Sequence, residues 1–176
     1  FNKSNDYIYN LPGELPFLSN KGKIKTIGIV SMLAPWKGLH DILWFATCYE
    51  QQLRGLGIES IIVYGAQIYS TKGAHQDYFS DCENLLKIYP CKLVHFAGRK
   101  NPREIFSKID LLVHSSIKPE PFGRVLAEGF LSGVPVISTA LGGAGELVRH
   151  KETGLKYSPF HHQELLLLIK LITLSF

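Results

Sequence analysis

Short runs of β-branched residues alternate with helix-like segments along most of this chain. Residues 24–30 form the first run, and the segment 38–53 after it carries apolar residues at helical spacing before Gly55 and Gly57. We expect strands at 24–30, 60–64, 92–96, 110–114, 134–138 and 154–157, and helices at 38–53, 76–89, 102–108, 122–131, 144–150 and from 160 onwards. Strands that alternate with helices predict βαβ units on a parallel sheet.

Such a sheet has a preferred winding. Crossovers between parallel strands are right-handed, and in doubly wound sheets they commonly give the strand order 3-2-1-4-5-6. We therefore expect an α/β fold with a doubly wound, Rossmann-like parallel sheet of six strands. Its first and fourth strands are neighbours where the winding reverses, and ligands bind outside their carboxyl ends. The predicted binding loops are residues 31–38 and 115–121.

Composition argues against several other classes of protein. The chain has 176 residues, of which 45% are hydrophobic and 19% charged, as in an ordinary globular domain. The net charge is +4, but the lysines and arginines are scattered, so we expect no nucleic-acid binding. The three cysteines form no CxxC pair, which predicts neither a zinc site nor a disulfide framework. Free cysteines are typical of a reducing compartment, and we expect a cytoplasmic protein.

The two ends of the chain differ from its middle. Residues 1–22 are rich in Asn, Pro and Gly and are predicted to be a linker, whose start without Met suggests an excised segment. Residues 23–176 are the predicted domain, truncated at its last helix. The stretch 165–174 is apolar around nearly the whole helix but too short to span a bilayer. We expect a missing domain to cover it; the alternative is peripheral contact with a membrane surface.

The first predicted binding loop ends in Lys37 and Gly38, directly before a helix. An ammonium group beside the free N–H groups of a helix start is a good setting for phosphate. A solvated surface lysine is the alternative, and for a single lysine the pattern alone favours it.

The second loop leads into a helix that carries two carboxylates. Two prolines hold Glu120 in extended backbone, and Gly123 allows a ligand to approach closely. The amides of Gly123, Arg124 and Val125 belong to a first helical turn, lack intrahelical partners and could bind a diphosphate. Glu128 lies one turn further, where a buried carboxylate would suit sugar hydroxyls. A partly exposed helix residue is the alternative for Glu128.

An ordered set of motifs runs through the second half of the chain. They lie at residues 111–116, 120–128, 133–137, 142–143, 146 and 153–155. Together with Lys37, Gly38, Gly65 and Gly98, they resemble the group 1 (family 4) retaining glycosyltransferases of GT-B architecture, over about residues 24–157. Glu120 and Glu128 match the E-x7-E motif of that family. The chain would then be the C-terminal, donor-binding half of a GT-B enzyme.

The resemblance implies a role for each matched residue. Lys37 would neutralise the donor phosphates and Glu120 would contact the donor sugar, which makes these two the implied catalytic residues. The amides from Gly123 to Val125, with Arg124, would hold the diphosphate and sugar. Glu128 would bind the ribose hydroxyls. Gly98 and Arg99 would lie against the base.

The reaction that the resemblance implies is transfer of a hexose from a UDP- or GDP-linked donor, with retention at the anomeric carbon. It implies no metal and no cofactor. The acceptor would be a polysaccharide or a lipid-linked glycan, bound by the missing N-terminal domain. We therefore expect this segment alone to bind donor without turnover.

One position departs from the family pattern. The family usually carries an arginine where this chain has Met32, five residues before Lys37. Losing it removes a charge-assisted phosphate contact. Arg99 or Arg124 could substitute, donor affinity could be weak, or the domain could be a degenerate, non-catalytic one that binds nucleotide or a partner.

Other functional classes fit the residues less well. The loop after the first strand has no G-x-G-x-x-G, as a nicotinamide-binding domain would need, and no GxxxxGK of a P-loop phosphotransferase. A GT-B nucleotide-sugar epimerase or phosphorylase is a further alternative. Whether the activity of the full-length protein depends on an acceptor would distinguish these enzymes from a glycosyltransferase.

Overall fold

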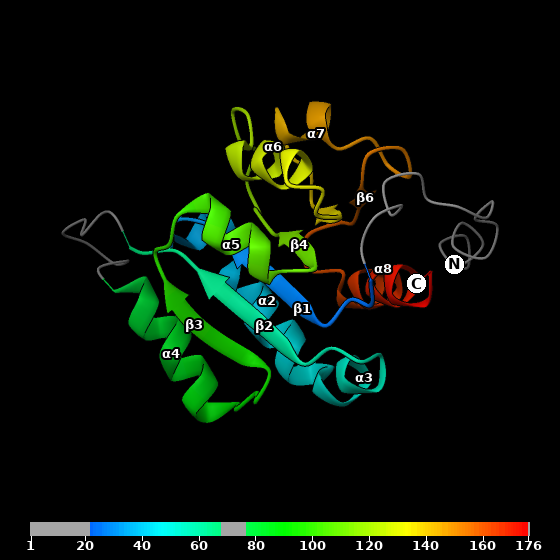
Figure 1. Ribbon diagram of the computed structural model, residues 1–176. Coiled ribbons are helices and arrows are strands. Elements are labelled where there is room, and N and C mark those ends of the chain that lie inside the picture. Colours follow the sequence, from blue (N-terminus) through cyan, green and yellow to red (C-terminus); the bar gives the residue numbers. More distant parts are fainter. Residues whose placement is uncertain (1–21, 68–76, 176) are drawn as a thin grey trace, which may run out of the picture.

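The computed structural model describes residues 22–67 and 77–175, and these form one sheet with helices on both of its faces (Figure 1). The sheet has six parallel strands in the order β3-β2-β1-β4-β5-β6, which confirms the expected winding. The strands are β1 (Thr26–Val30), β2 (Ser60–Tyr64), β3 (Val94–Gly98), β4 (Leu111–His114), β5 (Val136–Ser138) and β6 (Leu155–Lys156). The predicted linker at 1–22 lies almost wholly outside the described residues.

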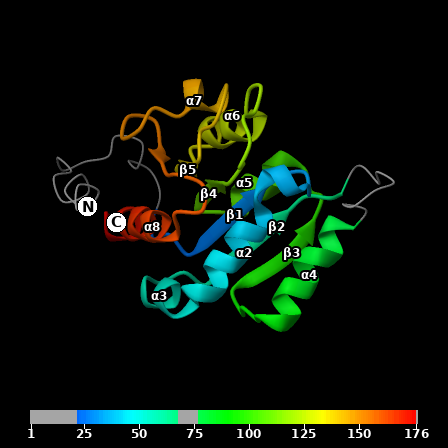
Figure 2. The same cartoon turned by 180° about the vertical axis from the view of Figure 1, so that it is seen from behind.

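The helices divide between the two faces of the sheet (Figures 1 and 2). One face carries α2 (Leu39–Cys48), α4 (Tyr78–Ile88) and α8 (His162–Leu174), with α3 (Glu50–Gly55) continuing from α2. The opposite face carries α5 (Pro102–Lys108), α6 (Arg124–Leu131) and α7 (Ala144–Leu147). The 3-10 turn η2 (Pro35–Lys37) precedes α2.

Helices cover both faces of the sheet, so its central strands β1 and β4 are mainly apolar and largely buried. In β1, Ile27 and Ile29 belong to the core beneath α2, α4 and α8. A side chain at Gly28 would point to the opposite face, where an added Cβ would lie 2.5 Å from the Ile109 side chain. Ile109 belongs to a second core, beneath α5, α6 and α7, which also contains Leu112 of β4. Alternate residues of one strand therefore build two separate cores.

Several element boundaries differ from the expected ones. The predicted helix at 38–53 is two helices, because Tyr49 leaves helical geometry with φ −116° and ψ 17°. The third strand starts and ends two residues later than predicted. The predicted helix at 144–150 ends at Leu147, since Val148 is extended and its buried side chain joins the second core.

The last helix, α8, is covered mainly on one side. Leu165, Leu168, Ile169 and Ile172 are buried in the core beneath α2. Leu166 and Leu171 are half-buried against the same core, and Leu174 is exposed. Across the two described stretches, no helix is long and apolar enough to cross a bilayer.

Two loops at the carboxyl edge are fastened to each other directly. The Ser115 hydroxyl donates to the Lys37 carbonyl at 2.9 Å, and the Ile117 amide donates to the Trp36 carbonyl at 2.9 Å. Gly38 lies at this junction with φ 70°, and a Cβ there would lie 2.2 Å from the Ser115 carbonyl oxygen. The loop after β1 can therefore approach the loop after β4 only with glycine at this position.

We expect Gly38→Ala to lower the free energy of unfolding by about 1–3 kcal/mol, because alanine would be strained at positive φ and would meet backbone. Urea unfolding measures the effect. Gly55→Ala is the matched control: nothing lies within 4 Å of its Cβ position, and it ends helix α3, so it should be neutral or slightly stabilising. Equal effects of the two substitutions would contradict the close approach.

Candidate functional site

The candidate site lies where the winding of the sheet reverses. Strand β1 pairs with β4, and Gly28 is opposite Leu112. Just beyond this pair, the turn η2 follows β1 and the loop at 115–123 follows β4. These loops border a cavity of about 560 Å³. A cavity at the carboxyl ends of parallel strands is where doubly wound sheets bind ligands.

The cavity brings together most of the residues singled out from the sequence. Its lining includes Lys37, Arg99, Glu120, Gly123, Arg124, Val125 and Glu128. Met32 lies on the same wall, as does His114. Gly98 instead lines a neighbouring cavity of about 600 Å³, beside Phe79 and Phe96. The structure shows that most of these residues line one cavity. The roles assigned to them are still predictions.

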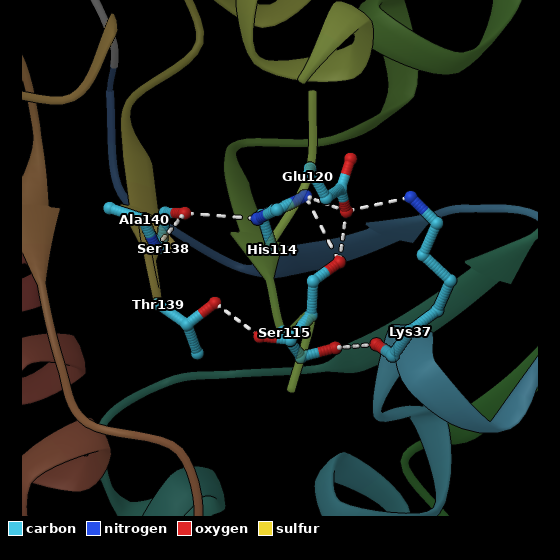
Figure 3. Close-up of polar contacts among 8 residues, drawn as sticks. Lys37, His114, Ser115, Glu120, Ser138, Thr139 and Ala140 are labelled. Carbon is cyan, nitrogen blue, oxygen red and sulfur yellow. Dashed lines mark hydrogen bonds and ion pairs between the residues drawn. The ribbon is translucent and has the colours of Figure 1, made fainter. Parts of the chain in front are cut away.

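Glu120 is the centre of the polar contacts in this cavity (Figure 3). Its Oε1 atom lies 2.6 Å from Lys37 Nζ and 2.9 Å from His114 Nε2. The Ser116 hydroxyl donates to the same oxygen. The Glu120 side chain is 12% exposed and the Lys37 side chain 17%, so the pair is largely removed from water.

These contacts fix the ionisation state of Glu120. Burial alone would raise the pKa of its carboxyl group. Hydrogen bonds from His114, Lys37 and Ser116 outweigh burial and hold the pKa well below its usual range. Glu120 is thus a fixed anion and hydrogen-bond acceptor at neutral pH, and a weak base.

His114 is the residue that sequence reasoning missed. It ends β4, its side chain is 5% exposed, and its Nδ1 atom lies 2.9 Å from the Ser138 Oγ atom at the end of β5. His114 lies in the motif at residues 111–116, which contributed to the family resemblance, but the resemblance gave this residue no role. A useful signal was available: a histidine at the carboxyl end of the strand beside the switch point faces the predicted site.

The N-terminus of α6 opens on the same cavity. Its first residue is Arg124, and the preceding Gly123 has φ 86° and supplies no side-chain cap. The Leu126 and Ala127 amides both donate to the Gly123 carbonyl. The amides of Arg124 and Val125 have no acceptor among the described residues, and unpaired donors at a helix start suit an anion.

Glu128 lies about one turn along α6 and is half-buried beside the same cavity. Two carboxylates and the unpaired amides of one helix therefore border a single space. Within the described part of the chain, no three His, Cys, Asp or Glu side chains are grouped so as to hold a metal ion.

Comparisons with known proteins identify relatives of this chain. The family model described as glycosyl transferases group 1 matches residues 15–174. YtcC of Bacillus subtilis, a putative glycosyltransferase, is 28% identical over 133 residues, which cover 74% of this chain and 32% of that protein. N-acetyl-alpha-D-glucosaminyl L-malate synthase of Bacillus anthracis is 42% identical over 62 residues, or 35% of this chain and 16% of that protein.

Solved structures are also similar to this chain. Anabaena Alr3699/HepE in complex with UDP and glucose has a TM-score of 0.71 and 29% identity, covering 98% of this chain and 46% of that one. Staphylococcus aureus TarM, at 15% identity and a TM-score of 0.72, shares the fold, over 94% of this chain and 30% of its own. The chain thus spans less than half of HepE and about a third of YtcC.

The low pKa of Glu120 predicts a contribution to stability that acid removes. An ordinary Glu has a pKa of about 4.3, so this contribution is complete above roughly pH 5 and is lost as pH falls towards the lower folded-state pKa. Glu120→Gln should therefore be less stable than wild type by about 1–3 kcal/mol at pH 7, with a gap that narrows by pH 3. Urea unfolding at both pH values measures it.

Glu59→Gln is the matched control for this series. Glu59 pairs with Lys25 at 2.7 Å, but their side chains are 64% and 53% exposed, so the substitution should change stability little at either pH. A gap for Glu120→Gln that stays constant from pH 7 to pH 3 would contradict the assignment of Glu120 as a buried anion.

Proposed function

The chain belongs to the group 1 glycosyl transferases, and on that basis we propose that it binds a nucleotide-sugar donor for transfer of the sugar to an acceptor. The observation that carries the proposal is the shared cavity at the β1–β4 switch point. There, a largely buried lysine–glutamate pair borders the same space as the Arg124 and Val125 amides at the start of α6, which have no acceptor among the described residues.

The cavity offers separate groups for the separate parts of a donor. We assign the diphosphate to the Arg124 and Val125 amides and to Lys37, because all three residues line the same cavity. Fixed dipoles and cations aimed at a departing diphosphate stabilise the negative charge that develops there, which is the largest catalytic contribution in many enzymes. We assign this part of the chemistry to Lys37 and the start of α6.

The carboxylates complement the hydroxyl groups of the donor. Glu120 accepts a hydrogen bond from the sugar, and Glu128, one helical turn further, accepts from the ribose. The base lies towards Gly98 and Arg99, where the two cavities adjoin through Gly65 and Ala66. HepE, a relative of 29% identity, has been solved with UDP and with UDP-glucose, which supports a UDP-sugar as the first donor to test, ahead of a GDP-sugar.

The remaining features of the reaction rest on the family resemblance. We propose transfer with retention, without metal or cofactor, to a polysaccharide or lipid-linked glycan held by a domain outside this chain. The cytoplasm, with peripheral membrane contact of the longer protein, is the proposed setting.

Lys37→Met should weaken UDP binding roughly tenfold, because it removes a charged donor from the proposed diphosphate site. Isothermal titration with UDP-, GDP- and ADP-sugars, without metal, measures affinity and identifies the base. Lys92→Met is the matched control. That exposed lysine precedes β3, so it lies at the amino ends of the parallel strands, whereas the cavity lies at their carboxyl ends. Equal affinity of the Lys37 variant and wild type would exclude the proposed phosphate contact.

Met32→Arg should tighten nucleoside-diphosphate binding, because Met32 lines the cavity and an arginine can form a bidentate contact with phosphate. Met32→Leu controls for changes in packing without charge. The expected order of affinity is Met32→Arg above wild type, with Met32→Leu equal to wild type. Unchanged affinity of the arginine variant would refute the idea, and an absence of binding in all three proteins would favour a degenerate, non-catalytic domain.

A further inference from the structure

Ser138, at the end of β5, is fully buried, and its hydroxyl oxygen contacts two groups of the described residues. The Ala140 amide donates to Oγ at 2.9 Å, and His114 Nδ1 lies 2.9 Å from the same atom (Figure 3). A buried hydroxyl hydrogen needs an acceptor. Among the residues that the structure describes, Nδ1 of His114 is the acceptor within reach of it.

This requirement selects one form of the histidine ring. If the Ser138 hydroxyl donates to Nδ1, the imidazole is neutral and carries its hydrogen on Nε2. Nε2 then donates to Glu120 Oε1, 2.9 Å away. A hydrogen on Nδ1 would leave the buried Ser138 hydroxyl without an acceptor in the described part of the chain, which is costly.

The Glu120 carboxylate is held by one oxygen. Lys37, His114 and Ser116 all contact Oε1, and Oε2 has no recorded partner among residues 22–67 and 77–175. Figure 3 shows the second oxygen pointing away from His114. The carboxylate therefore presents Oε2 for a further donor.

The three partners of Oε1 differ in stiffness. Lys37 ends a long side chain with several rotatable bonds, and holding such a chain in one geometry is entropically costly. The His114 ring has two torsions, is held from both nitrogens and is 5% exposed. Ser116 is short and 1% exposed, so it too restrains the carboxylate. The orientation of the carboxylate thus depends more on His114 and Ser116 than on Lys37, and His114 is the partner that is itself held by a second strand, through Ser138 of β5.

We propose that His114 is a positioning residue, fixed by Ser138 as the neutral tautomer with hydrogen on Nε2, which orients Glu120 so that Oε2 accepts from a donor-sugar hydroxyl. The sugar contact rests on the proposed function, whereas the tautomer does not. Sequential donation from Ala140 to Ser138, His114 and Glu120 couples the ends of β4 and β5 to one carboxylate oxygen. His114 acts only through Glu120.

The tautomer is tested first, in the intact protein with ¹⁵N-labelled histidine at neutral pH. Long-range ¹H–¹⁵N spectra distinguish the two neutral tautomers and the imidazolium, and the signal lost in His114→Gln identifies His114. We expect the Nε2–H tautomer in wild type and loss of that single form in Ser138→Ala. An Nδ1–H tautomer or an imidazolium in wild type would overturn the proposal.

The effect on Glu120 is tested by comparing sugar nucleotides with the bare nucleotide. Affinities for UDP, UDP-glucose, UDP-galactose, UDP-N-acetylglucosamine and GDP-mannose are measured by titration. Ser138→Ala and His114→Leu should lose roughly tenfold of the affinity for the preferred nucleotide-sugar, with little change for its nucleoside diphosphate. His114→Gln should retain part of it, because its amide can donate to Glu120.

Thr153→Val is the matched control. The half-buried Thr153 hydroxyl donates to the Leu147 carbonyl at 2.9 Å, and Thr153 is not among the residues that line the cavity, so the variant loses a side-chain hydrogen bond away from His114 and Glu120. It should keep the full preference for the nucleotide-sugar. Equal losses in Thr153→Val and Ser138→Ala would overturn the positioning role. Failure of wild type to bind any nucleotide would reject the proposed function, and the tautomer would still decide whether Ser138 fixes His114.

Discussion

A buried carboxylate is the constraint on which this site depends. Glu120 is largely removed from water, and an isolated charge there would be very costly unless paired and hydrogen-bonded. Its partners come from different elements: Lys37 from η2, His114 from β4 and Ser116 from the following loop. The carboxylate can be satisfied only if β1 and β4 are neighbours and their loops touch. The β1–β4 pairing brings Lys37 to Glu120, and the Lys37–Glu120 ion pair in turn joins the loops that follow these two strands.

The same arrangement separates two kinds of recognition. Lys37 and the start of α6 offer hydrogen-bond donors to the cavity, and Glu120, which is paired with Lys37, and Glu128 offer acceptors. Anionic phosphates need donors and neutral hydroxyl groups can use acceptors, so we expect a ligand that carries both to prefer one orientation in this cavity. The buried hydrogen bonds through His114 and Ser138 reach only Oε1 of Glu120, and Oε2 has no partner in the described part of the chain.

The alternation of apolar runs and helical segments was sufficient to predict the strand order, because right-handed crossovers leave few alternatives. It also located the cavity, since Lys37, Glu120 and Glu128 fall beside the predicted switch point. The break at Tyr49 was not predicted, because apolar residues continue at helical spacing across it and no Gly or Pro marks the position. His114 was missed for a similar reason. A single histidine has many structural uses, and only the fold brings it to Ser138 and Glu120.

The claim that this cavity binds a nucleotide-sugar is tested most directly by following the backbone amide resonances during titration with UDP-glucose, without metal. We expect the largest shifts at Arg124 and Val125, whose amides are unpaired within the described residues, with further shifts at Lys37, Arg99 and Glu128. GDP- and ADP-sugars in the same titration would identify the base. Saturable shifts confined to residues away from this cavity, or none with any of the three nucleotides, would contradict it.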